Sequence, residues 1–157
     1  MSCHFKTNES LSDQTIKKII ELKNFDTAFF VQRQIYLSYL ALSIHHASAD
    51  EDFSIIARDL HQQYMPYVEW VDGVHMFCSF GHLGGYRSRY YSYLWSRVFA
   101  VDIFSVFKTK GLRNSYIGSL YVDTILKPGG TKDPNILLEN FLGRKPSVDE
   151  FFKMFDL

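Results

Sequence analysis

Three tyrosines and one arginine between positions 86 and 97 are the residues best placed, by type and spacing, to do chemistry. If this segment is an α-helix, its turn of about 100° per residue puts Tyr86, Tyr90 and Tyr93 on one face, and Arg97 extends the row. Phenols have a pKa of about 10 and stay protonated at neutral pH, so they can hold peptide carbonyls or stabilise a developing oxyanion. Tyrosines at helical spacing are also common core residues, so the residues alone leave both interpretations open.

A histidine and two glycines precede this row. Gly84 and Gly85 follow His82 closely and stand directly before the first tyrosine. Glycine adopts backbone conformations that are closed to other residues. We therefore expect the segment from 67 to 85 to be a loop whose His82 end moves against a ligand.

The histidines do not have the spacing of a metal site. The sequence contains no His-Glu-x-x-His and no two histidines four residues apart, the arrangement that chelates zinc from one helix face. His45 and His46 are adjacent and point about 100° apart on a helix, so they cannot bind one metal ion together. We expect instead a histidine whose ring is hydrogen-bonded at the end of a helix. His4 and His61 have no acidic or cysteine partner at ligand spacing, and we expect both at the surface. No metal ligand is assigned to this chain.

Composition and charge narrow the class of protein. The 157 residues carry 17 Lys plus Arg and 17 Asp plus Glu, and this zero net charge argues against nucleic-acid or membrane binding driven by bulk charge. The longest uncharged stretch, 34–49, is shorter than the ~20 apolar residues of a membrane span. Cys3 and Cys78 are too few for a disulfide framework. With no secretory signal visible, we expect a cytoplasmic location, and an organellar one stays open.

The pattern of apolar residues and caps predicts one all-α domain over 1–157. Aromatic residues make up 17% of the chain, whereas only 9 Gly and 4 Pro interrupt it. We expect seven helices: a short one after Ser12, then 26–46, about 50–65, 86–110, 114–127, 134–142, and a last one that opens with a Ser147 and Glu150 capping box. The helix at 26–46 is apolar nearly all round, so we expect it to be central.

Several of these segments together resemble a known family. The runs 82–86 and 90–96, together with 125–134, 141–147, 4–7 and 29–34, are similar to the C-terminal region of the thimet oligopeptidase family of zinc metallopeptidases, which includes neurolysin, oligopeptidase A and mitochondrial intermediate peptidase. Essentially the whole chain is covered. The resemblance implies an almost wholly helical channel fold that cleaves short peptides, with zinc as its cofactor.

The resemblance also implies roles for individual residues. His82, Gly84, Gly85 and Tyr86 match the substrate loop, and the tyrosines contact substrate or stabilise the tetrahedral intermediate. We therefore assign Tyr90 and Tyr93 as catalytic residues and the loop residues, with Arg97, to substrate binding. Two departures concern subsite preference: the loop is one residue shorter than the thimet and neurolysin form, and Arg87 and Arg89 add positive charge.

Three interpretations follow for the chain as a whole. The first is the C-terminal, substrate-binding part of a zinc metallo-oligopeptidase, as a fragment, split-gene product or truncated paralogue that works with a separate chain carrying the zinc site. The second is an inactive, stand-alone helical protein that binds short peptides. The third is a purely structural helical domain whose tyrosine row is core.

Overall fold

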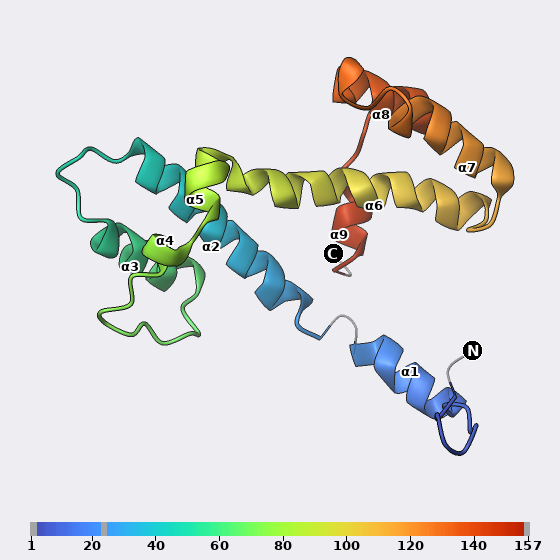
Figure 1. Cartoon of the computed structure of the whole chain (residues 1–157), viewed down its shortest axis with the longest axis horizontal. Helices are drawn as coiled ribbons and strands as arrows, with labels where there is room; N and C mark the ends of the chain where they lie inside the picture. The colour runs from blue at the N-terminus through green and yellow to red at the C-terminus, as the bar shows by residue number, and fades with distance from the viewer. Residues whose placement is uncertain (1–2, 23–24, 156–157) are drawn as a thin grey trace.

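The computed structural model describes residues 3–22 and 25–155, and over these ranges the fold is all-α (Figure 1). The α-helices are α1 (Asp13–Leu22), α2 (Thr27–His46), α3 (Phe53–Tyr64), α4 (Met76–Ser79), α5 (His82–Gly85), α6 (Ser92–Lys110), α7 (Ser115–Tyr121), α8 (Pro134–Leu142) and α9 (Asp149–Lys153). Three further turns are helical: the 3-10 turns η1 (Arg87–Tyr91) and η3 (Gly129–Thr131), and the π-helical turn η2 (Val122–Leu126). The only β pairing within the described ranges is a single bridge between Cys3 and Ser10.

The seven expected helices correspond to α1, α2, α3, α6, α7 with η2, α8 and α9. Their caps explain why the boundaries follow from the sequence. The side chains of Asp52, Asn114 and Asp133 each accept a backbone N–H of the first turn, as N-caps do, and Gly143 ends α8 with φ of 68°. The Ser12 hydroxyl likewise accepts the N–H of Thr15 at 3.2 Å.

The prediction that residues 67–85 form a loop is partly wrong. Its second half folds into the two short helical turns α4 and α5, and His82 begins the latter. The rings of Phe77 and Phe80 pack against the α2–α3 core. This packing holds the segment in a helical conformation, although its apolar and polar residues alternate as they do in a strand.

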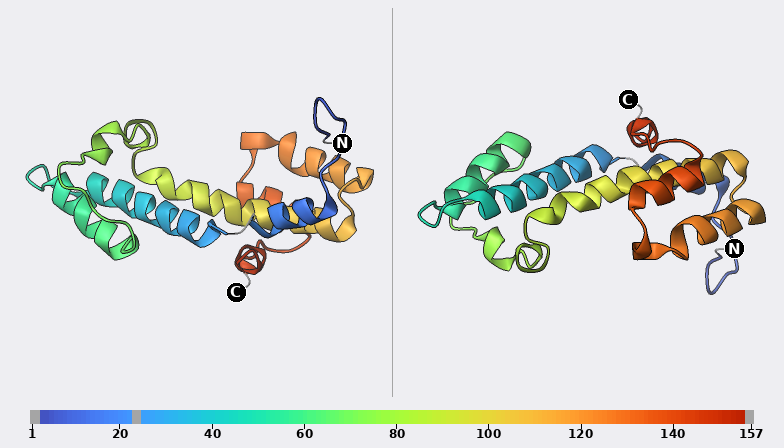
Figure 2. Two further views of the ribbon diagram at one scale, coloured as in Figure 1. Left: turned by 90° about the horizontal axis from the view of Figure 1, so that it is seen from below. Right: turned by 90° about the horizontal axis from the view of Figure 1, so that it is seen from above.

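Two long helices, α2 and α6, give the molecule an elongated shape (Figures 1 and 2). They meet near α5 and diverge from there; α3 packs on α2, while α7, α8 and α9 pack along α6. One core lies between α2, α3 and η1, where Leu40 and Ala41 are fully buried. The second lies between α6 and α8, where the ring of Phe141 stacks on that of Phe107 at 5.9 Å between centroids. The helix α2 is central as expected, but Phe29 and Phe30 in its first turn are exposed.

A buried ion pair fixes the C-terminal segment to α6. Asp102 is fully buried. Its carboxylate accepts hydrogen bonds from both terminal nitrogens of Arg144 and from the backbone N–H of Ser147, the last at 2.8 Å. Burial acts to raise the pKa of Asp102, but the bonds from Arg144 and Ser147 outweigh it and hold that pKa below its ordinary value. The pair therefore sets the position of α9 against α6.

The same contact changes the expected capping box of α9. The Ser147 hydroxyl accepts the N–H of Asp149 at 3.1 Å, as a cap would. The return bond is absent among the described residues, because the N–H of Ser147 is taken by Asp102 and the Glu150 carboxylate accepts a bond from Lys153 at 2.7 Å instead. The capping-box prediction is therefore only half right.

Much apolar surface is left uncovered. In α1, which lies apart from the other helices in Figure 1, Ile16, Ile19 and Ile20 are all exposed and no residue is buried. Large apolar side chains also lie exposed on α2, α6 and α8. No helix in the described part of the chain has the length and apolar character that crossing a membrane requires.

This surface predicts how the isolated chain behaves in solution. We expect a helical far-UV circular dichroism spectrum together with several-fold enhancement of the fluorescence of an apolar dye, because exposed apolar patches of this extent bind such dyes. A strand-rich spectrum, or no dye binding by a monomer, would contradict this expectation.

Candidate functional site

The site is built around Tyr90, which anchors the turn η1 on α2. Tyr90 is 8% exposed, and its hydroxyl donates to the Oε1 atom of Gln34 at 3.1 Å. Gln34 is itself buried, and its backbone carbonyl accepts a hydrogen bond from the hydroxyl of Ser38 at 2.7 Å. A hydrogen bond between buried groups is costly to break, because the donor and the acceptor would both be left without a partner. The Tyr90 ring is therefore fixed in place.

His82 lies at the centre of the tyrosines. Its ring centroid is 5.6 Å from that of Tyr86, 5.2 Å from that of Tyr90 and 5.6 Å from that of Tyr93. Tyr93 in turn lies 5.8 Å from Tyr86 and 5.1 Å from Tyr90. We call these four residues the His82–tyrosine cluster. Its edge-to-face and stacked contacts are those that aromatic rings prefer.

The tyrosines come together for a different reason from the one expected. No continuous helix runs from position 86: Arg87 has a positive φ of 53°, Arg89 is also non-helical, and α6 begins only at Ser92. Tyr86 therefore reaches the other rings across a kinked turn, with His82 from α5 filling the space between. A positive φ at a non-glycine residue is uncommon, and such backbone occurs preferentially at functional sites.

The two glycines do not have the special conformation that we expected. Gly84 and Gly85 lie in a helical turn with ordinary negative φ, and open space surrounds the position where each Cβ would be. In this conformation they keep the surface beside His82 free of side chains.

Two hollows border the cluster, and His82 and Tyr90 line both. The Arg33 hollow, of about 530 Å³, is lined by Arg33, Leu37, Met76, Ser79, Phe80, Gly81, His82, Gly85, Tyr86 and Tyr90. The Arg97 hollow, of about 480 Å³, is lined by Phe30, Gln34, His82, Tyr90, Tyr93, Ser96, Arg97 and Ala100. The structure thus gathers every expected site residue except Gly84 around these hollows. Each is large enough to receive side chains of an extended peptide.

The hydroxyl of Tyr93 is the one suited to act on a ligand. Tyr93 is 44% exposed, whereas the Tyr90 hydroxyl is already used by Gln34. The neighbouring hydroxyl of Tyr86 and, after it, partial burial raise the pKa of Tyr93 above its ordinary value. Tyr93 therefore keeps its proton at neutral pH and remains a hydrogen-bond donor.

Residues of α2 are the part of the site that sequence reasoning missed. Phe30, Arg33 and Gln34 line the hollows from a helix more than 45 positions earlier in the chain. The available signal was the polar pair Arg33–Gln34 within an apolar helix, and position 34 also lies in a segment that carries the family resemblance. Nothing local in that pair indicates which partner it meets.

The described residues do not hold a group of three or more His, Cys, Asp and Glu side chains that could bind a metal ion. His45 is satisfied at a helix end as expected, with its Nδ1 atom 2.8 Å from the carbonyl of Ala41. His4 is exposed as expected, but His61 is not an ordinary surface residue. It is half-buried, with its ring packed against those of Tyr36 and Trp70.

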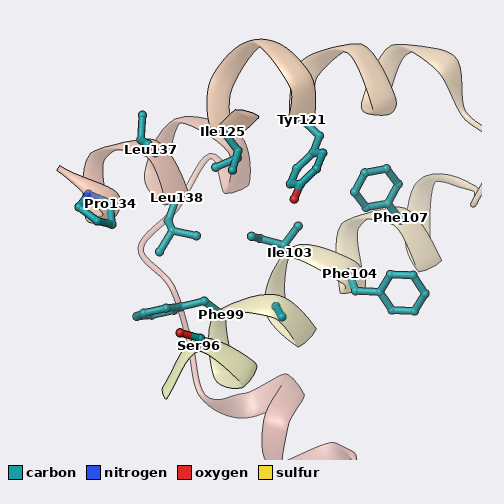
Figure 3. Close-up of a pocket in the computed structure, with 11 residues that line it drawn as sticks. Ser96, Phe99, Ile103, Phe104, Phe107, Tyr121, Ile125, Pro134, Leu137 and Leu138 are labelled. Carbon is teal, nitrogen blue, oxygen red and sulfur yellow. The ribbon is translucent and has the colours of Figure 1, made fainter. Parts of the chain in front are cut away.

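A third hollow, of about 490 Å³, lies between α6, η2 and α8 and is almost wholly apolar (Figure 3). Its polar groups are the hydroxyls of Ser96 and Tyr121, and the side chains of Ile103, Ile125 and Leu138 point into it. It contains no titratable group other than that phenol. This hollow therefore offers a ligand no acidic or basic side chain.

Comparison with known proteins identifies relatives over the whole chain. The family model described as Peptidase family M3 matches residues 1–157. Oligopeptidase A of Haemophilus influenzae is 32% identical over 157 residues, which cover 98% of this chain and 23% of that protein. A thimet-like oligopeptidase of Dictyostelium discoideum is 35% identical over 162 residues, and saccharolysin of Saccharomyces cerevisiae is 32% identical over 159, covering 24% and 22% of those proteins. The chain spans about a quarter of the length of these relatives.

Proposed function

The chain belongs to peptidase family M3, and we propose that it is the C-terminal, peptide-contacting part of a zinc metallo-oligopeptidase that hydrolyses short peptides. The observation that carries this proposal is the His82–tyrosine cluster, whose four rings pack together and line two hollows. Relatives named as oligopeptidases and the family match support the reaction class.

Each residue of the cluster would have a different role in binding or hydrolysing the peptide. Tyr93, half-exposed and protonated, would donate its hydroxyl to the oxyanion that forms at the attacked peptide carbonyl. Tyr86 would contact the bound peptide beside it. Tyr90, whose hydroxyl holds Gln34, would support the wall that both hollows share. His82 would pack against the peptide backbone, with the bare surface of Gly84 and Gly85 admitting the chain closely.

The zinc that the resemblance implies does not fit the residues described in this chain. They contain no group of three or more ligand-type side chains, and a zinc site needs at least three protein ligands. No step through the metal is therefore derived. We propose that the zinc site lies on sequence outside this chain, either in a longer polypeptide or on a separate partner chain, and that the exposed apolar surface packs against it.

A second candidate is a stand-alone peptide-binding protein without activity. It is favoured by the fact that residues of this chain form the cluster and line both hollows. We also propose a cytoplasmic location for either form, supported by the two free cysteines, Cys3 and Cys78.

Binding of a labelled short peptide by the purified chain tests the common element of both candidates. We expect saturable fluorescence anisotropy, and we expect His82→Ala to weaken binding by about tenfold because the central ring of the cluster is removed. Tyr116→Phe on α7, an exposed tyrosine distant from the cluster, is the control and should leave the affinity unchanged. Elemental analysis should find much less than one zinc per chain. Failure to bind any peptide, or equal weakening by both variants, would contradict the proposal.

A further inference from the structure

The elements that build the site are basic, although the whole protein has no net charge. The helix α2 and the segment 73–101 together contain Arg33, Arg87, Arg89 and Arg97, and neither contains Asp, Glu or Lys. The protein otherwise balances 17 basic against 17 acidic residues. The excess positive charge is therefore concentrated on the surfaces that meet at the His82–tyrosine cluster.

Two of these arginines, both exposed, line the hollows, one in each. Arg33 reaches the first from α2, and Arg97 reaches the second from α6. No acidic residue lines either hollow. Within the described part of the chain, no carboxylate lies within 4.0 Å of either guanidinium, whereas Arg58 and Arg144 both have such a partner.

We propose, on the basis of the peptide site proposed above, that Arg33 and Arg97 each bind a peptide carboxylate and so make the site selective for anionic peptides. A guanidinium presents two parallel N–H donors that match the two oxygens of a carboxylate, and charge assistance strengthens both bonds. Because His82 and Tyr90 line both hollows, the two arginines would bind two groups of one extended peptide. The acceptors are an acidic side chain or the C-terminal carboxylate.

Arg87 and Arg89 would add to the preference for anionic peptides through the electrostatic field around the site. Both are exposed at the kink beside the cluster. Charges of one sign around a cleft raise the local concentration of oppositely charged ligands, and added salt screens the effect. The preference for anionic peptides should therefore fall as the salt concentration rises, while the binding of neutral peptides should change little.

Matched peptides test the proposal with the full chain. One labelled nonapeptide is made with a central Glu or Gln, each with a free or an amidated C-terminus, and the dissociation constants are measured by anisotropy. We expect at least one carboxylate to tighten binding about tenfold over its neutral isostere. The comparison of Glu with Gln tests recognition of an acidic side chain. The comparison of the free with the amidated C-terminus tests recognition of the terminal carboxylate.

Variants assign the preference to the two arginines. Arg33→Gln and Arg97→Gln should each reduce the ratio of anionic to neutral peptide affinity several-fold, and the double variant should bring that ratio to about one. Arg113→Gln, an exposed arginine outside both hollows, removes the same charge and should leave the preference intact. Equal binding of anionic and neutral peptides, or an equal loss with Arg113→Gln, would overturn this inference and leave the peptide site standing. Binding of none of the four peptides would overturn the peptide site as well.

Discussion

Arg144→Gln should lower the free energy of unfolding by about 3–5 kcal/mol at pH 7, because it leaves a buried carboxylate without its counter-ion. The side chain of Asp102 is fully buried while that of Arg144 is 46% exposed, so the cost arises at Asp102. Urea denaturation followed by circular dichroism measures the loss. Arg113→Gln, which removes an exposed arginine, should change the stability by less than about 0.5 kcal/mol.

The pH dependence distinguishes this cause from a general loss of packing. The bonds from Arg144 and Ser147 hold the pKa of Asp102 below its ordinary value. The stability that they supply is therefore complete above the unfolded pKa of 3.8 and is lost as the pH falls through the lower folded pKa. In the Arg144→Gln variant only the Ser147 N–H still opposes the effect of burial, so the pKa of Asp102 rises. Protonation of Asp102 then relieves part of the destabilisation.

The difference between the wild-type protein and the Arg144→Gln variant should accordingly shrink as the pH is lowered. Adding Asp102→Asn to Arg144→Gln should recover part of the lost stability, because the buried charge is gone. A constant difference across pH, with no recovery in the double variant, would show that the pair contributes only packing.

Tyr93→Phe should lower kcat by about 10²-fold with little change in KM, once the zinc-bearing part of a family relative is supplied as a separate chain or by fusion. The substitution removes one hydroxyl and keeps the ring that packs against His82, Tyr86 and Tyr90. A donor that acts only on the developing oxyanion affects the transition state and not substrate binding. Steady-state hydrolysis of a fluorogenic peptide measures both constants.

Tyr86→Phe is the matched comparison within the cluster. Tyr86 stands at the start of the kinked turn and lines the Arg33 hollow, so its loss should raise KM as well. Equal and small effects from both variants would mean that the cluster is only aromatic packing. If the combined protein folds and binds zinc but cleaves no peptide, the stand-alone binding protein becomes the better interpretation.

The helices could be predicted because their signals are local. Asn114 and Asp133 cap the helices that follow them, and Gly143 ends α8 in the left-handed conformation that glycine favours. The kink at Arg87 could not be predicted, because an arginine carries no preference for a positive φ. The burial of Tyr90 against α2 and the packing of His82 among the rings impose that backbone from outside the segment.

The residues that form the cluster could be predicted to lie together, but their geometry could not. His82, Tyr86, Tyr90 and Tyr93 do meet, but through a kinked turn in place of one regular helix face. Gln34 and Arg33 were missed because their partners lie about 50 positions away in the sequence, and Asp102 and Arg144 are likewise 42 positions apart. Contacts of this kind depend on how helices pack, which no periodicity within one helix reveals.

The location of a bound peptide tests the central claim most directly. A short peptide carrying a photoreactive benzophenone side chain is irradiated with the chain, and mass spectrometry identifies the cross-linked residues. We expect adducts within 82–97 and 30–34, which unlabelled peptide suppresses. Adducts confined to the apolar hollow between α6 and α8, or spread along the chain and unaffected by competitor, would contradict a peptide site at the His82–tyrosine cluster.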